Sequence, residues 1–167
     1  VVDVVEPDQT IRRLETMHRD PEKVNIAKEL AARYANRSET AHGSRGAIRT
    51  GRSQLVTEVT DEVLRGIASD EEHLKLIRML GLCSIIVVPL RTRQGVLGAI
   101  TFVTAESGRR YDARDLEVAE ELASRASQAI ENSRLVADVE EARALLEQQA
   151  TELEAQAADL EALTSDH

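Results

Sequence analysis

The stretch that decides the fold is residues 80–104, LGLCSIIVVPLRTRQGVLGAITFVT. Residues 82–90 are almost all apolar, which predicts a central strand buried on both faces. Residues 93–95, RQG, have the composition of a hairpin turn, and a second apolar stretch follows at 96–104. These residues predict two adjacent antiparallel strands within a sheet.

The segments before this hairpin predict further strands, with helices between them. Residues 1–5 and 10–18 flank the turn sequence EPDQ and predict an opening hairpin. Another strand is expected at 54–59. Capping residues and apolar spacing predict helices over residues 21–34, 43–50, 61–68 and 70–81. The expected fold class is α+β, an antiparallel sheet of four or five strands flanked by helices.

The remainder of the chain predicts one long helix. Asp112, with Asp115 three residues later, forms an acidic capping box, and neither Gly nor Pro follows. A helix over residues 113–163 would be about 75 Å long at about 1.5 Å per residue. This length exceeds a small domain, so the second half must bury its apolar side against another surface.

A seven-residue apolar repeat in this helix predicts a coiled coil. With Leu146 and its equivalents at heptad position d, glutamates at e face uncharged residues at g, which favours a parallel dimer. The expected dimer interface comprises Val139, Leu146, Ala150, Leu153, Ala157 and Leu160. The alanine layers of this interface pack weakly, so the two helices are expected to have two rotational or register arrangements of similar energy. The alternative is a surface helix packed on its own domain.

Composition restricts the partners. Residues 135–167 hold nine acidic residues and one base, Arg143, so they carry −8 of the net charge of −9. No basic stripe is present and aromatic residues are scarce, so neither nucleic acid nor direct membrane contact is expected. The single cysteine, Cys83, fits a reducing, cytoplasmic location.

Residues 50–134 resemble a GAF domain, a small-molecule-sensing relative of PAS domains. The resemblance is carried by RTGR at 49–52, VPL at 88–90, LGAITF at 97–102 and YDARDLEVAEELASRASQAIENSRL at 111–135. It implies a sensor domain over residues 1–134, followed by a coiled-coil signalling helix over 135–167. Because the chain begins at Val1 without Met, we expect an excised segment that lacks the family's leading helix.

The resemblance also implies a ligand cavity on one face of the sheet. Strand alternation places Cys83, Ile85 and Val87 on one face, which Thr101 and Val103 are expected to share. If this face lines the cavity, an apolar or flat ligand is expected. The alternative is plain core packing.

His73 is the most distinctive candidate. DEEH at 70–73 followed by LG at 80–81 is similar to a segment of bilin-binding GAF domains, in which some members carry a pigment-binding Cys where this chain has Glu72. A covalent bilin is therefore not expected, and the cofactor stays unknown. His73 is a candidate to donate to a ligand or bind haem iron, or else an ordinary helix histidine.

Three other residues are weaker candidates. His42 is expected in a loop over the mouth of the cavity, with Arg45 and Arg49 placed to pair with an anionic ligand; the alternative is a solvated loop. The histidines lack metal-ligand spacing. One subset of GAF proteins reduces methionine sulfoxide with several cysteines, whereas this chain has only Cys83.

The sequence thus predicts a non-catalytic sensor from a bacterial multidomain signalling protein. It would form a homodimer through the C-terminal helix and relay a signal to a covalently linked output domain, such as the histidine kinase of a two-component system. The alternatives are a purely structural dimerisation scaffold with a filled pocket, and a redox or haem sensor.

Overall fold

The computed structural model describes residues 1–6, 8–34 and 43–165, with side chains as far as residue 157. It divides into two compact units, Val1–Gln128 and Ala129–His167. The first unit contains the sheet, the shorter helices and the start of the long helix, and the second contains the remainder of that helix. Within the described residues, no helix combines the length and apolarity needed to cross a bilayer.

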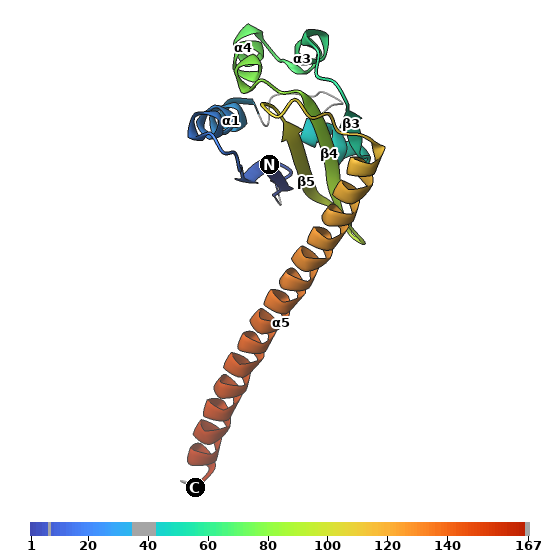
Figure 1. Ribbon diagram of the computed structural model, residues 1–167. Helices are drawn as coiled ribbons and strands as arrows, with labels where there is room; N and C mark the ends of the chain where they lie inside the picture. Colours follow the sequence, from blue (N-terminus) through green and yellow to red (C-terminus); the bar gives the residue numbers. More distant parts are fainter. Residues whose placement is uncertain (7, 35–42, 166–167) are drawn as a thin grey trace. The chain divides into compact units, whose positions relative to one another are not determined.

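A five-stranded antiparallel sheet is the centre of the first unit (Figure 1). Its order is β2-β1-β5-β4-β3. The strands are β1 (Val2–Val5), β2 (Ile11–Glu15), β3 (Gln54–Val56), β4 (Ser84–Thr92) and β5 (Gly95–Thr104). Both predicted hairpins are confirmed, but β4 begins two residues later than expected and β3 ends three residues earlier.

The apolar run in β4 forms the centre of the sheet's core. Ile86, Val88 and Leu90 are at most 1 % exposed, and Val87, which points to the opposite face, is 2 % exposed. The strand is therefore buried on both faces, as the continuous run of β-branched residues predicts.

Four short helices lie on one face of the sheet. They are α1 (Pro21–Tyr34), α2 (Gly43–Thr50), α3 (Asp61–Ile67) and α4 (Glu71–Leu80). The predicted caps are present: Val63 N donates to the Thr60 hydroxyl at 3.3 Å, and His73 N donates to the Asp70 carboxylate at 2.7 Å. Helix α4 ends at Gly81, whose φ of 63° is left-handed.

The helices pack in two ways. Helices α1, α3 and α4 share an apolar cluster among themselves, formed by Leu30, Tyr34, Leu64, Leu74 and Ile77. Helix α2 instead lies directly on the sheet, where Ala47 packs against Val87 and Ala99. The part of this sheet face that α2 does not cover therefore faces the layer of α1, α3 and α4 across a gap.

A close approach of two backbones fixes the position of β1. Gly98 of β5 is the register partner of Val4 in β1. A Cβ atom added to Gly98 would stand 2.9 Å from the Val4 Cα atom and 3.1 Å from the Asp3 carbonyl carbon. Only glycine leaves room for β1 at this spacing.

The long helix, α5 (Ala113–Ser165), begins at the predicted capping box. Arg114 N and Asp115 N both donate to Asp112 Oδ1, and Asp112 N donates to Asp115 Oδ2 at 3.0 Å. In the first unit α5 buries Ala119, Ala123 and Ser127, which share one helix face.

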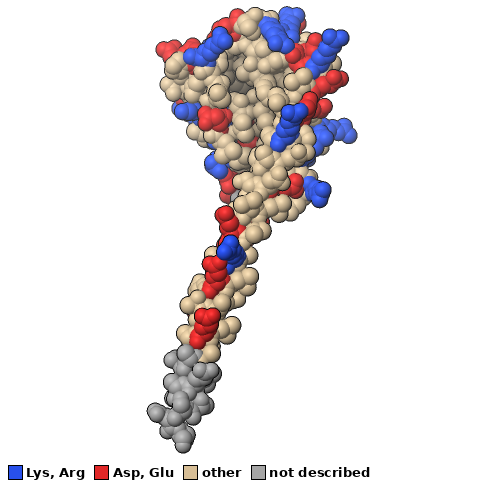
Figure 2. All heavy atoms as spheres, turned by 60° about the horizontal axis from the view of Figure 1, so that its bottom comes forward, with Lys and Arg blue, Asp and Glu red and all other residues tan. Residues whose placement is uncertain are grey.

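In the second unit every residue from Asn132 to Ala157 is exposed. Acidic side chains follow this part of α5 beside uncharged ones (Figure 2). Several large aliphatic side chains are among the exposed residues, including Leu135, Val136, Val139, Leu145, Leu146 and Leu153.

Candidate ligand-binding site

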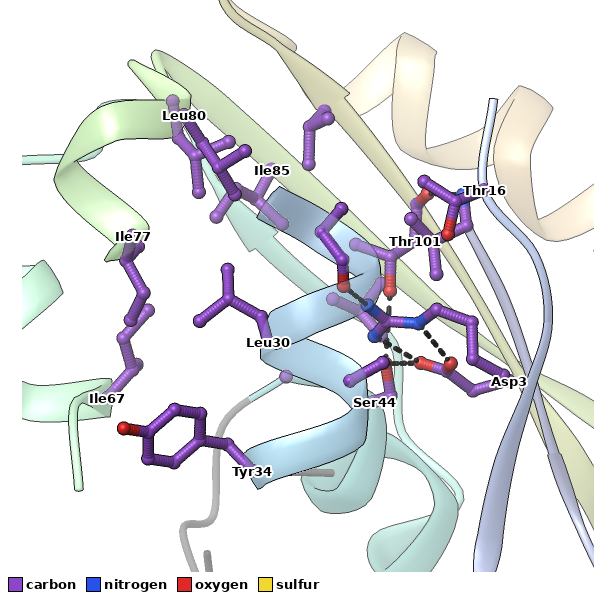
Figure 3. Close-up of a pocket in the computed structure, with 18 of the residues that line it drawn as sticks. Asp3, Thr16, Leu30, Tyr34, Ser44, Ile67, Ile77, Leu80, Ile85 and Thr101 are labelled. Atoms are coloured by element: carbon purple, nitrogen blue, oxygen red, sulfur yellow. Dashed lines mark hydrogen bonds and ion pairs between the residues drawn. The ribbon is translucent and has the colours of Figure 1, made fainter. Parts of the chain in front are cut away.

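A cavity of about 620 Å³ lies between one face of the sheet and the layer of α1, α3 and α4 (Figure 3). Its volume is within the range of about 300–1,000 Å³ that is usual for small-molecule sites. The cavity exists because α2 covers only part of the sheet, while the other helices pack mainly against one another.

The sheet contributes one wall. Ile85, Val87, Thr101 and Val103 all line it, as the strand alternation predicts. In the register of β4 and β5, Ile85 pairs with Val103 and Val87 pairs with Thr101. Each pair places two side chains on the same face, so this wall is aliphatic with one hydroxyl group.

The helices contribute the opposite wall, which is also mainly aliphatic. Leu30 of α1 and Ile77 of α4 are buried in the helical cluster and also line the cavity. Ile67 at the end of α3 and Leu80 at the end of α4 extend this wall (Figure 3). A molecule held between the two walls would bury mainly apolar surface.

A polar cluster interrupts the apolar lining. Asp3 is only 2 % exposed, and its carboxylate accepts hydrogen bonds from Arg13 Nε at 2.8 Å and Arg13 Nη2 at 3.2 Å. Arg13 Nη1 also donates to the Ala27 carbonyl of α1 at 3.2 Å. The bidentate pairing neutralises both charges, as a buried carboxylate requires.

The hydroxyl groups of this cluster have defined hydrogen-bond directions. Ser44 Oγ donates to Asp3 Oδ2 at 2.5 Å and lies 3.2 Å from Thr101 Oγ1. A serine hydroxyl has only one proton, so Thr101 must be the donor in the second bond. Thr101 Oγ1 therefore keeps its acceptor lone pairs for a further partner.

A second hydroxyl group lies nearby. Thr16, which follows β2, also lines the cavity. Its Oγ1 atom is buried and has no hydrogen-bond partner among the described residues. A buried hydroxyl without a partner carries a desolvation cost, which a polar group of a ligand would remove.

His73 lines the helical side of the cavity and is fixed by local contacts. Its Nδ1 atom accepts a hydrogen bond from Ser69 N at 2.9 Å, so Nε2 carries the proton of the neutral ring. The ring stacks on Tyr34, with centroids 4.1 Å apart and planes 5° from parallel. Burial lowers the pKa of His73, and the charge of Asp70 partly opposes this change.

This geometry favours one role for His73. Binding haem iron through Nε2 would require the proton to leave that atom and the Ser69 contact to be lost. Donation from Nε2–H to a ligand requires neither change. The stacking also places Tyr34 in the helical wall, and the Tyr34 hydroxyl donates to Asp70 at 3.2 Å. Burial and this bond raise the pKa of Tyr34.

The other predicted residues lie elsewhere. Cys83 is not among the residues that line the cavity; it precedes β4, and its Sγ atom donates to the Ala105 carbonyl at 2.9 Å. Arg49 borders a smaller cavity of about 350 Å³, whereas Arg45 lines both this cavity and the larger one. His42 lies outside the described residues.

The polar cluster was missed by the sequence analysis. Asp3 and Arg13 are directly opposite each other in the register of β1 and β2. Opposite charges at facing positions of a predicted hairpin were therefore the available signal. Ser44 and Thr16 had no comparable signal. Among the described residues, no group of three or more His, Cys, Asp or Glu side chains is placed to hold a metal ion.

Comparisons with known proteins identify the architecture. A family model described as a GAF domain matches residues 2–131. No protein of curated function matches significantly. The third GAF domain of Slr1393 from Synechocystis sp. PCC6803, in its photoproduct state, is 17% identical with a TM-score of 0.56, and the match covers 83% of this chain and 84% of that chain.

Two further solved structures are similar. The cyanobacteriochrome TePixJ GAF domain is 18% identical, with a TM-score of 0.56 over 80% of this chain and 78% of that chain. A domain of a two-component sensor histidine kinase protein from Sinorhizobium meliloti 1021 is 15% identical, with a TM-score of 0.52 over 80% of this chain and 77% of that chain. At these identities the likeness shows the fold.

Proposed function

The chain belongs to the GAF domain family, and on that premise we propose that it is a regulatory sensor that binds a small molecule in the cavity between its sheet and helices. It has no catalytic activity of its own. It forms a homodimer through α5 and relays the state of the cavity to a covalently linked output domain, such as a histidine kinase.

The observation that carries the sensor proposal is the cavity of about 620 Å³, with aliphatic walls and a polar cluster at one side. Close packing is the rule in protein interiors, and a space of this size loses contacts unless something fills it. A ligand that restores those contacts stabilises the arrangement of helices around it, which is the elementary event of sensing.

Exposed aliphatic residues in the second unit support the dimer. Val139, Leu146 and Leu153 recur every seven residues and are 65–66 % exposed. Ala150 and Ala157 follow Leu146 and Leu153, respectively, at heptad position a. Most of the stability of a helix in a protein comes from packing its apolar side, and a second copy in parallel register presents the same stripe for this packing.

The same heptad phase can be counted back into the first unit. It places Val118 at d and Leu122 at a, and these residues are 59 % and 48 % exposed. They lie on a different face of α5 from the buried Ala119 and Ala123. We therefore include Val118 and Leu122 in the proposed seam, with α5 contacting the domain core on one side and the second copy on the other.

The sensor proposal is tested by native mass spectrometry of the chain purified under mild conditions from its own source. A bound small molecule of reproducible mass supports the proposal. A chain that is consistently free of small molecules would favour the structural scaffold instead, because the exposed heptad residues do not depend on the cavity.

The dimer proposal is tested by disulfide crosslinking in a Cys83→Ala background. Single cysteines at Leu146, Ala150 and Leu153 are expected to crosslink two copies rapidly. A cysteine at Gln148, which falls at heptad position f, is the matched control and is expected to crosslink slowly. Equal rates at all four positions, or a monomer in light scattering at high concentration, would refute the predicted interface.

A further inference from the structure

We propose that the cavity selects an electrically neutral, mainly aliphatic molecule carrying one hydroxyl or amide N–H group, which donates a hydrogen bond to Thr101 Oγ1. Carboxylates and phosphates are rejected. This inference rests on the proposed function, because it specifies the ligand class of the same cavity.

The cationic groups that line the cavity already have partners, which disfavours an anionic ligand. The guanidinium of Arg13 is held by the Asp3 carboxylate and by the Ala27 carbonyl. Lys23 donates to the Leu80 carbonyl and to Glu106, and the Val1 amine donates to the Thr101 carbonyl at 2.9 Å. Arg45 also lines the cavity and is not free. An anion placed beside Arg13 would also stand close to the Asp3 carboxylate, which is 2 % exposed and cannot be screened by water. The attraction and the repulsion offset each other, and the anion still loses its hydration. A neutral group does not incur this penalty.

The direction of the hydrogen bonds in the polar cluster requires a donor on the ligand. The Ser44 proton is committed to Asp3 and the Thr101 proton to Ser44, so Thr101 Oγ1 offers only acceptor lone pairs to the cavity. A ligand must therefore bring the proton. Thr16 Oγ1, buried without a partner among the described residues, adds a second hydroxyl that can donate to the same ligand group or accept from it. An alcohol or an N–H amide satisfies both.

The walls of the cavity favour a saturated ligand. They are built largely from leucine, isoleucine, valine and alanine side chains. Tyr34 and His73 also line the cavity, but each covers one face of the other. Burying a saturated hydrocarbon ligand against aliphatic side chains is favourable in proportion to the apolar area removed from water. The same side chains offer little of the ring stacking that would stabilise a flat aromatic ligand.

The test is a displacement assay on the full chain, stripped of apolar molecules on a hydrophobic resin. 1,6-Diphenyl-1,3,5-hexatriene, a neutral hydrocarbon dye that fluoresces in apolar cavities and has no hydrogen-bonding group, serves as the reporter. The competitors are decanol, its methyl ether and decanoate at neutral pH. Decanol is expected to compete at least about tenfold better than decanoate and about fivefold better than the ether, as one net hydrogen bond allows.

Variants of Thr101 identify the acceptor. Thr101→Val is expected to remove the preference for decanol over the ether, while Thr101→Ser retains it and the dye binds all three proteins alike. Thr57→Val, at an exposed threonine that does not line the cavity, is the matched control and is expected to retain the preference.

Two results would overturn this inference while the proposed function stands. They are competition by decanoate equal to or better than that by decanol, and a decanol preference that survives in Thr101→Val. A chain that binds neither the dye nor any competitor would overturn both the ligand class and the sensor proposal.

Discussion

Substituting Gly98 by Ala is the most direct challenge to the architecture of the site. The new Cβ atom would stand 2.9 Å from the Val4 Cα atom and 3.1 Å from the Asp3 carbonyl carbon. These contacts are to backbone, which cannot swing aside as a long side chain can. Strand β1 must therefore move away from β5, and Asp3 must move with it.

The cost has two parts. Overpacking in a well-ordered interior costs about 1–3 kcal/mol. Weakening the hydrogen bonds between β1 and β5, together with the Ser44–Asp3 bond, adds about 1 kcal/mol for each bond that is lost. We expect Gly98→Ala to lower the free energy of unfolding by about 3–5 kcal/mol, a large part of the total of about 5–15 kcal/mol of a typical domain.

The assay is scanning calorimetry with a urea titration at one fixed protein concentration, since dimerisation makes the melting temperature depend on concentration. At about 4 °C per kcal/mol, Gly98→Ala should melt about 12–20 °C below the wild type. Gly66→Ala is the control: nothing lies within 4 Å of its added Cβ atom, and Gly66 is helical. This control should gain about 0.5–1 kcal/mol.

A Gly98→Ala protein whose free energy of unfolding is within about 1 kcal/mol of the wild type would refute the close approach of β1 to β5, because a Cβ atom would then fit between the two backbones. A Gly66→Ala protein destabilised as strongly as Gly98→Ala would contradict this close approach as well. In that case the effect would not come from the approach of β1 to β5.

Three further perturbations test individual contacts. Burial lowers the pKa of His73 below its ordinary 6.5. The neutral ring therefore contributes its full stabilisation above that pH, and this stabilisation is lost as the pH falls through the folded-state pKa. His73→Gln should weaken the dependence of the melting temperature on pH across this range. Asp3→Ala should cost about 3 kcal/mol in urea titrations by leaving Arg13 unpaired, and adding Arg13→Met should recover about half. Asp112→Ala should cost about 1 kcal/mol through the lost cap of α5.

Each perturbation has a contrary outcome. A His73→Gln protein with the same pH profile as the wild type would mean that another group controls that window. If Asp3→Ala with Arg13→Met is no more stable than Asp3→Ala alone, the pair does not act as a unit. A neutral Asp112→Ala would mean that the start of α5 does not depend on its cap.

The elements of the first unit could largely be predicted because their signals are local. Thr60, Asp70 and Asp112 cap helices where the sequence indicated, and Gly81 ends α4 in the left-handed conformation. The apolar run that forms β4 was equally clear. Boundaries shifted where tertiary pairing decides them: β4 extends to Thr92 because its partner strand continues opposite it.

The site could be predicted only in part. Alternation placed Ile85 and Thr101 on one face of the sheet, and both line the cavity. The same alternation also placed Cys83 on this face, but that residue precedes the strand, and its thiol donates to the Ala105 carbonyl. The helical wall depends on how α1 packs against α4, which no short stretch of sequence encodes.

Arg13 joins three parts of the fold through one planar group. It holds β1 through Asp3 and α1 through the Ala27 carbonyl, and Asp3 in turn holds Ser44 of α2. The conformational freedom of these groups is therefore already lost when the chain folds. Under the proposed function, a ligand would meet these groups already ordered, so its association would be fast and would carry little entropic penalty at this side of the cavity. Under the proposed function, a movement that reports binding would then come from α3 and α4, which Arg13 does not hold.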